Sequence, residues 1–116
     1  MLERYLSPGD GVLDLGANVG KYTTIYANAI GPTGRIIAVE PHSDTIARLS
    51  TRCKGFSQVT CIQAAIGGNT LYVDVGDCQR NSLFSANRMQ LGQSHEVPTE
   101  TLDHLASLVP HLNAIK

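Results

Sequence analysis

The chain has 116 residues, of which 42% are hydrophobic and 16% are charged, and its formal net charge is −1. This balance is typical of a globular chain and excludes a disordered one. The near-neutral charge gives no electrostatic basis for binding nucleic acid, and no apolar run reaches the roughly 18 residues of a membrane span, so we expect neither kind of partner.

The N-terminus, the cysteines and the histidines indicate the cellular compartment and whether the chain holds a metal. The first residues, MLERYLSPGDG, lack the basic and then apolar layout of a signal peptide. The three cysteines are too far apart for a C-x-x-C pair, and the four histidines show neither H-x-x-x-H nor H-E-x-x-H spacing. We therefore expect a cytoplasmic protein with reduced thiols and no metal site.

The first elements follow from short apolar runs and strong breakers. Residues 11–15, GVLDL, follow a Pro-Gly-Asp-Gly turn and predict a buried strand. Residues 21–30 predict a helix with Ile25, Ala29 and Ile30 on one face, which the sequence GPTG at 31–34 ends. A second apolar strand is expected over residues 35–40.

The later elements are predicted from helix caps, short apolar runs and one long polar stretch. Ser43 is a suitable N-cap for a second helix, whose apolar stripe would be Ile46, Leu49 and Cys53. A third strand is expected near residues 59–62, and a fourth, antiparallel or at an edge, over residues 70–75. Residues 76–98 are polar and predict a long loop. Thr101 would cap a third helix, and the final residues, NAIK, resemble the start of another strand.

The order strand, helix, strand, helix, strand is typical of an α/β fold with a parallel sheet and crossover helices. Helices on both faces would explain why the strands are almost continuously apolar. The first strand would be central, with the second and third on one side. Because few residues remain to cover its other side, we expect residues 1–116 to be the N-terminal part of a single larger domain, with a sheet that is incomplete at its C-terminus.

The segment DLGANVGKYT, residues 14–23, joins the first strand to the first helix. A Walker A loop would need one more residue between its glycines and a Ser or Thr where Tyr22 stands. A dinucleotide loop would need a glycine at Asn18, and a carboxylate at Asp14 would repel a diphosphate. The segment therefore favours a cationic ligand without phosphate, such as S-adenosylmethionine, whose carboxylate could face the helix N-terminus.

An acidic residue at the end of the second strand supports this interpretation. Glu40 stands 24 residues after Gly16, where a carboxylate can accept hydrogen bonds from both hydroxyls of a ribose. Together with Asp14 and Gly20 these residues would form one site at the carboxyl ends of adjacent strands. The plain alternative, two turn glycines and a solvated acid, stays open.

The stretch SPGDGVLDLGANVGKYTTIYANAIGPTGRIIAVEPHSDTIARL resembles the FkbM-type methyltransferases, which are S-adenosylmethionine-dependent O-methyltransferases. The family patterns "pGd-vlDvGAnvG" and "A-EP" are matched at Gly9, Asp10, Asp14, Gly16, Ala17, Asn18, Gly20, Glu40 and Pro41. The segments QAAIG and VPTETLDHL resemble two later parts of the family pattern. That pattern continues with a strand "lKiDvEG", of which this chain holds only the first residues.

The resemblance implies a Rossmann-like class I methyltransferase sheet, S-adenosyl-L-methionine as cofactor, and a hydroxyl on a small molecule or sugar as methyl acceptor. It implies that Asp14 supports the ammonium of the cofactor and that Glu40 binds its ribose. The other implied cofactor-binding residues are Gly16, Ala17, Asn18 and Gly20 around the methionine, and Pro41, His42 and Ala65, or Ala64, around the adenine.

The catalytic base is not identified by the sequence. His42, His95 and Asp103 are candidates by chemistry or pattern, and Asn81 and Ser82 lie in the predicted loop. Two other functions stay open: a fragment of an NAD(P)-binding oxidoreductase, and a nucleotide-binding module without catalysis. The sequence does not fix the oligomeric state.

Overall fold

A computed structural model of the chain describes residues 2–67, 71–74, 83–85 and 94–116. After a short 3₁₀ helix at Leu2–Tyr5, the main elements are β1 (Gly11–Leu15), α1 (Lys21–Ile30), β2 (Arg35–Val39), α2 (Ser43–Arg52), β3 (Val59–Ile62), α3 (Leu102–Ser107) and β9 (Leu112–Ile115). Five short strands lie between β3 and α3: β4 (Ala65–Ile66), β5 (Leu71–Asp74), β6 (Leu83–Ser85), β7 (Ser94–Val97) and β8 (Thr99–Glu100).

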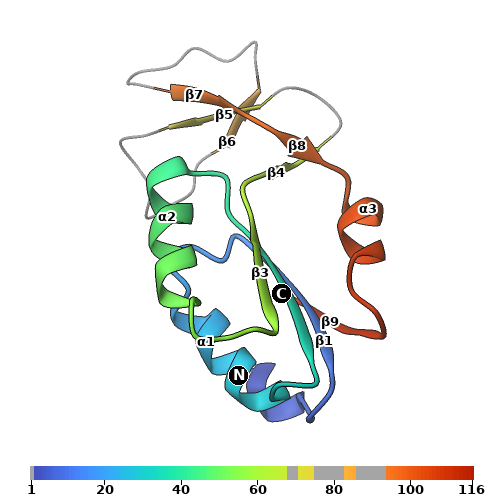
Figure 1. Ribbon diagram of the computed structural model, residues 1–116. Helices are drawn as coiled ribbons and strands as arrows, with labels where there is room; N and C mark the ends of the chain where they lie inside the picture. Colours follow the sequence, from blue (N-terminus) through green and yellow to red (C-terminus); the bar gives the residue numbers. More distant parts are fainter. Residues whose placement is uncertain (1, 68–70, 75–82, 86–93) are drawn as a thin grey trace.

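The main sheet has the order β3-β2-β1-β9, and all of its strands are parallel (Figure 1). Leu13 in β1 pairs with Ile37 on one side and with Ile115 on the other. The strand expected to begin at the final residues is β9, and it covers the other side of β1. The predicted α/β fold is confirmed, with β1 in the middle of a Rossmann-like sheet.

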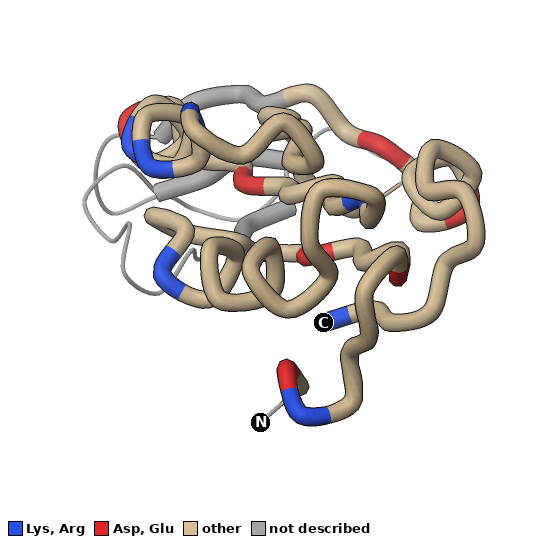
Figure 2. The backbone as a smooth tube through the Cα atoms, turned by 60° about the horizontal axis from the view of Figure 1, so that its bottom comes forward, with Lys and Arg blue, Asp and Glu red and all other residues tan. Residues whose placement is uncertain are grey.

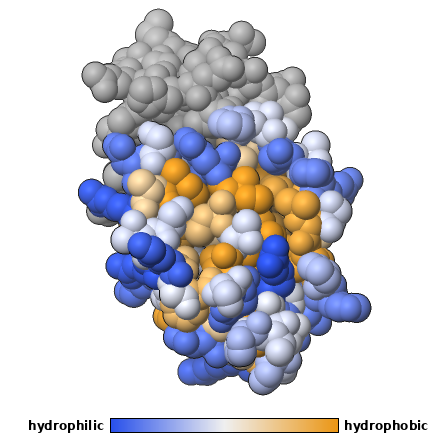
Figure 3. Space-filling view, in the orientation of Figure 1, coloured by the Kyte–Doolittle hydropathy of each residue, from blue (hydrophilic) through white to orange (hydrophobic). Residues whose placement is uncertain are grey.

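Helices cover both faces of this sheet and create two apolar cores. Residues of α1 and α2 pack on one face of the sheet, around Val12 and Ile36. On the other face α3 packs against Leu13 and Ile37, through Leu105 and other apolar residues. Side chains alternate along a strand, so the residues of β1 contribute in turn to the two cores. Figure 3 shows an apolar area on the side of the molecule where β3 forms the edge of the sheet.

The buried face of α1 differs from the predicted one. Its buried residues are Thr23, Tyr26, Ala27 and Ile30, at helical spacing, whereas Ile25 is 37% exposed. The hydrophobic pattern failed here because a threonine occupies a core position. The predicted stripe on α2 is closer to the observed one, although the residue that caps this helix is His42 rather than Ser43.

The predicted fourth strand is β5, and it lies outside the main sheet. It pairs antiparallel with both β6 and β7, and Figure 1 shows these three strands beyond the carboxyl ends of the main strands. The prediction of an irregular loop over 76–98 is wrong where the structure describes it, because residues 83–85 and 94–97 are strands. Asn81 and Ser82 lie outside the described residues.

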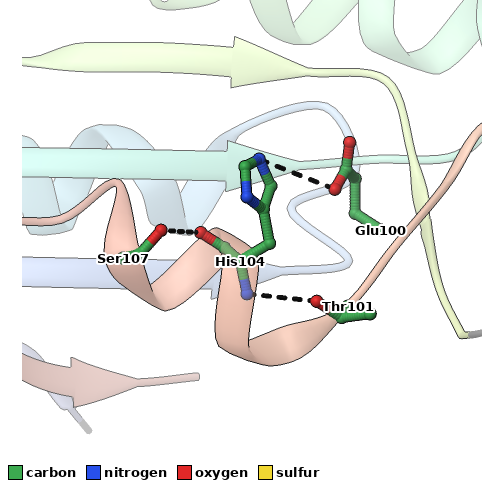
Figure 4. A network of polar contacts seen from close by, with 4 residues as sticks. All are labelled: Glu100, Thr101, His104 and Ser107. Carbon is green, nitrogen blue, oxygen red and sulfur yellow. Dashed lines mark hydrogen bonds and ion pairs between the residues drawn. The ribbon is translucent and has the colours of Figure 1, made fainter.

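The third helix begins at the predicted cap. The hydroxyl of Thr101 accepts a hydrogen bond from the backbone N–H of His104 at 3.1 Å, and Figure 4 shows this contact beside the ion pair of His104 with Glu100. The cap stabilises the start of α3, which holds Leu105 against the sheet. In the described part of the chain, none of the helices has the length and apolarity needed to cross a membrane.

Candidate functional site

The loop between β1 and α1 turns through a series of left-handed residues. Gly16, Asn18 and Gly20 have φ values of +68°, +56° and +89°. Glycine adopts this conformation without strain, and asparagine is among the few other residues that tolerate it. The loop is held over the end of β2 because the N–H of Ala17 donates to the carbonyl of Val39 at 2.9 Å.

The two predicted glycines serve different purposes. A Cβ on Gly20 would lie 2.8 Å from Cδ1 of Leu49, so this glycine lets α1 pack closely against α2. A Cβ on Gly16 would meet no atom within 4 Å. The backbone at Gly16 is therefore open to a molecule outside the chain, as expected of a loop that a ligand approaches closely.

Glu40 is buried at the end of β2 and is joined to the loop. Its Oε1 accepts the N–H of Asn18 at 2.9 Å, and its Oε2 accepts the N–H of His42 at 3.0 Å. Burial raises the pKa of Glu40, and the two backbone hydrogen bonds oppose that rise. Each carboxylate oxygen has two lone pairs, so one on each remains able to accept a further donor.

Asp14 is buried beneath the loop rather than exposed at the tip of its strand. Its Oδ2 accepts the hydroxyl of Thr23 at 2.7 Å, and its Oδ1 lies 3.8 Å from Nζ of Lys116. Burial raises the pKa of Asp14, whereas the bond from Thr23 and the charge of Lys116 lower it. This differs from the expected free charge: Lys116 balances the carboxylate, so Asp14 alone gives little repulsion toward a phosphate.

The remaining predicted residues lie at the ends of β2 and β3. Pro41 and His42 are buried directly after Glu40, and Ala64 and Ala65 are buried after β3. A hydrogen bond of 3.2 Å from Nε2 of Gln63 to the carbonyl of Pro41 connects the two segments. The structure thus brings the predicted residues together at the carboxyl edge of three neighbouring strands.

A hollow of about 360 Å³ opens beside the glycine loop. The first helical residues Lys21 and Tyr22 line it, together with Lys116 and loop residues 16–19. Helix α1 begins without a side-chain cap, so its first N–H groups have no side-chain acceptor. Because Lys116 is paired with Asp14, the positive potential here comes mainly from the uncapped helix start and Lys21, and it suits an anionic group.

Sequence reasoning missed two residues of this site. Thr23 lies nine residues after Asp14, in the first turn of α1, where a hydroxyl is well placed to bond back to the strand. Lys116 is brought to Asp14 by the pairing of β9 with β1, which only the tertiary fold reveals. Figure 2 shows the C-terminus, and with it Lys116, in the middle of the fold.

Neither a base nor a metal centre emerges from the described residues. His42 is buried beside Glu40, and Asp103 is exposed in the first turn of α3. His95 lies in β7, and its side chain is outside the described part of the structure. Across residues 2–67, 71–74, 83–85 and 94–116, no group of three or more His, Cys, Asp or Glu side chains could hold a metal ion.

Solved structures resemble this chain over part of its length. A protein of Clostridium thermocellum described as an rRNA methylase has a TM-score of 0.51 and 23% identity, over 53% of this chain and 35% of that one. Fibrillarin of Aeropyrum pernix, solved with natively bound S-adenosyl-L-methionine, has a TM-score of 0.48 and 30% identity, over 49% of this chain and 25% of that one. This chain thus spans about a third or less of those structures, and the first similarity shows the fold alone.

A sequence family gives a more extensive match. No curated protein matches the chain. The Methyltransferase FkbM domain, in contrast, matches residues 14–115, from the buried aspartate of β1 to the last residue of β9. The sequence patterns at the glycine loop and at Glu40 are therefore parts of a match that covers most of the chain. The chain belongs to the FkbM methyltransferase family.

Proposed function

We propose that this chain binds S-adenosylmethionine and belongs to an enzyme that transfers its methyl group to a hydroxyl on a small molecule or sugar. Membership of the FkbM methyltransferase family supports the reaction class. The observation that carries the proposal is the pair of hydrogen bonds on Glu40, directly after β2: one from the left-handed Asn18 fixes it to the loop, and one comes from His42. Acid and loop therefore form one rigid unit at the edge where open α/β sheets bind ligands.

Each part of this unit suits one part of the donor. The free lone pairs of Glu40 can accept both ribose hydroxyls, and the open backbone at Gly16 can receive the methionine part. Oδ1 of Asp14 accepts no hydrogen bond in the described structure and can accept the ammonium. Pro41 after Glu40 and Ala65 after β3 lie at the same edge of the sheet and would flank the adenine.

The chemistry requires mainly that donor and acceptor are held in line. In the transfer, the acceptor oxygen forms a bond to the methyl carbon, the bond from carbon to sulfur breaks, and its electron pair converts the sulfonium to a thioether. The acceptor proton passes to a base that we do not assign. The described residues contribute by fixing the donor, because positioning alone accounts for a large part of the rate in such displacements.

Calorimetry with three ligands tests the proposal. S-adenosylhomocysteine, NADH and Mg-ATP are titrated separately into the protein, and only S-adenosylhomocysteine should bind. Binding of NADH alone would instead support an oxidoreductase fragment. Binding of Mg-ATP alone would support a nucleotide-binding module.

The ribose role of Glu40 is tested by the variant Glu40→Ala. It should weaken S-adenosylhomocysteine binding by about 1.5–3 kcal/mol, as expected for hydrogen bonds to a charged group. Asp44→Ala, which removes an exposed carboxylate from the first turn of α2, is the matched control and should bind normally. Thermal unfolding of both variants checks the fold, and unchanged affinity in folded Glu40→Ala would remove Glu40 from this role.

A further inference from the structure

The pairing of β1 with β9 contains an irregularity at the amino end of β1, at the opposite end of the strand from the glycine loop. Gly11 pairs with Leu112, but the next residue, Val12, pairs with Ala114. Asn113 is therefore an extra residue in β9, and its side-chain Oδ1 accepts the N–H of Gly11 at 2.9 Å. Such bulges re-aim the side chains that follow them.

The bulge decides which side chain stands beside Asp14. The N–H of Lys116 donates to the carbonyl of Leu13 at 2.9 Å, and its carbonyl accepts the N–H of Leu15 at 3.0 Å. These two bonds fix Lys116 next to Asp14. If Asn113 instead paired with Val12 in a regular register, the apolar Ile115 would stand beside Asp14.

The ammonium of Lys116 covers the carboxylate oxygen that a ligand would use. Its Nζ lies 3.8 Å from Oδ1 of Asp14, the oxygen that has no hydrogen-bond partner in the described structure. The same Nζ lies 5.7 Å from the ring centroid of Tyr22, and so does Nζ of Lys21. Lys21 and Lys116 thus line the hollow beside the loop. Asp14 is buried and does not line it, but its Oδ1 is paired with Lys116.

We propose that Lys116 determines which donor the site accepts, by requiring a carboxylate on the amino-acid arm of the donor. This inference rests on the proposed function. A ligand that brings only an ammonium must compete with Lys116 for Asp14, and like charges repel it. A ligand that also brings a carboxylate offers Lys116 a new partner, so that Lys116 can turn to the carboxylate and leave Asp14 to the ligand ammonium. Lys21 adds a second cation to the lining of the same hollow.

Two ligands that differ only in this group test the proposal. S-adenosylhomocysteine and its decarboxylated form share the adenosine, the thioether and the ammonium, and neither carries a sulfonium charge. Wild-type protein should bind S-adenosylhomocysteine more tightly, by about tenfold or more, as expected for one charge-assisted hydrogen bond. In Lys116→Met this preference should shrink about tenfold, because the carboxylate loses its partner and the ammonium loses its competitor.

Two matched variants separate charge from structure. Lys116→Arg keeps the cation and should largely keep the preference. Lys54→Met removes an exposed lysine after α2, which does not line the hollow, and should behave like wild type. Thermal unfolding confirms that each variant is folded.

The outcomes distinguish the two proposals. If wild-type protein binds no S-adenosylhomocysteine, both the proposed function and this inference are wrong. If it binds S-adenosylhomocysteine and folded Lys116→Met retains the full preference for the carboxylate, the donor assignment stands and the role of Lys116 is overturned.

Discussion

The substitution Thr23→Val should destabilise the fold by removing the hydrogen bond that ties α1 to β1. Valine keeps the shape of threonine and has nearly the same helix propensity. Thr23 is fully buried, and the carboxylate of Asp14 accepts no other hydrogen bond in the described structure. A bond to a charged group contributes about 1.5–3 kcal/mol, and we expect the upper part of this range, because the carboxylate would stay buried without a donor.

The loss should depend on pH in a defined direction. Burial raises the pKa of Asp14, so the stability linked to this group is present below its unfolded value and is lost as pH rises through the folded value. Thr23 opposes that loss by lowering the pKa. Without Thr23 the folded pKa rises further, so Thr23→Val should lose more stability than wild type as the pH increases.

Urea unfolding followed by circular dichroism at pH 3.5, below the ordinary Asp value of 3.8, and at pH 8 measures both effects. Thr24→Val is the control, because the hydroxyl of Thr24 bonds only to the exposed carbonyl of Lys21, and its loss should change stability by less than about 0.5 kcal/mol. A loss in Thr23→Val that is as small as in the control, or that is the same at both pH values, would refute the role assigned to this bond.

Two further predictions concern the loop and a thiol. Gly20→Ala combines left-handed strain with a clash against Leu49 and should lower the free energy of unfolding by about 2–4 kcal/mol. Gly16→Ala carries only the strain and should lower it by about 1–2 kcal/mol. Equal urea midpoints for the two variants would contradict this ranking. Burial, with a contribution from Cys61, raises the pKa of Cys53 to about 11. Its reaction with a disulfide reagent, followed at Cys53 by peptide mass spectrometry in the unmodified sequence, should therefore be slow at pH 8 and still accelerate above pH 10. A rate that levels off by pH 9 would show an accessible thiol.

Local chemistry explains why much of the fold could be predicted. The strands β1 and β3 begin and end where their apolar runs predict; in β1 this follows because both faces of the strand are buried, whereas β3, at the edge, is half-buried. The cap at Thr101 was also predictable, since a side chain that bonds three residues ahead needs no tertiary context.

Long-range contacts explain what the sequence could not show. Thr23 is buried through a bond to a strand, so a pattern based on hydrophobicity assigned the core face of α1 partly to Ile25 instead. The bulge that brings Lys116 to Asp14 depends on a bond between Gly11 and Asn113, residues 102 positions apart. No local signal predicts such a register, and the balanced charge of Asp14 was missed for that reason.

The parallel pair of β4 and β8 bears on how this fold can diversify. Ala65 pairs with Thr99, and Ile66 pairs with Glu100, so the chain departs and returns through two adjacent strands. When both ends of an excursion are anchored side by side, lengthening it costs an entropy that grows only with the logarithm of its length. The length and sequence between β4 and β8 can therefore change during evolution while the strands β3, β2, β1 and β9 keep their spacing. With the proposed function, such an arrangement would separate variation toward new methyl acceptors from the constraint of holding one donor.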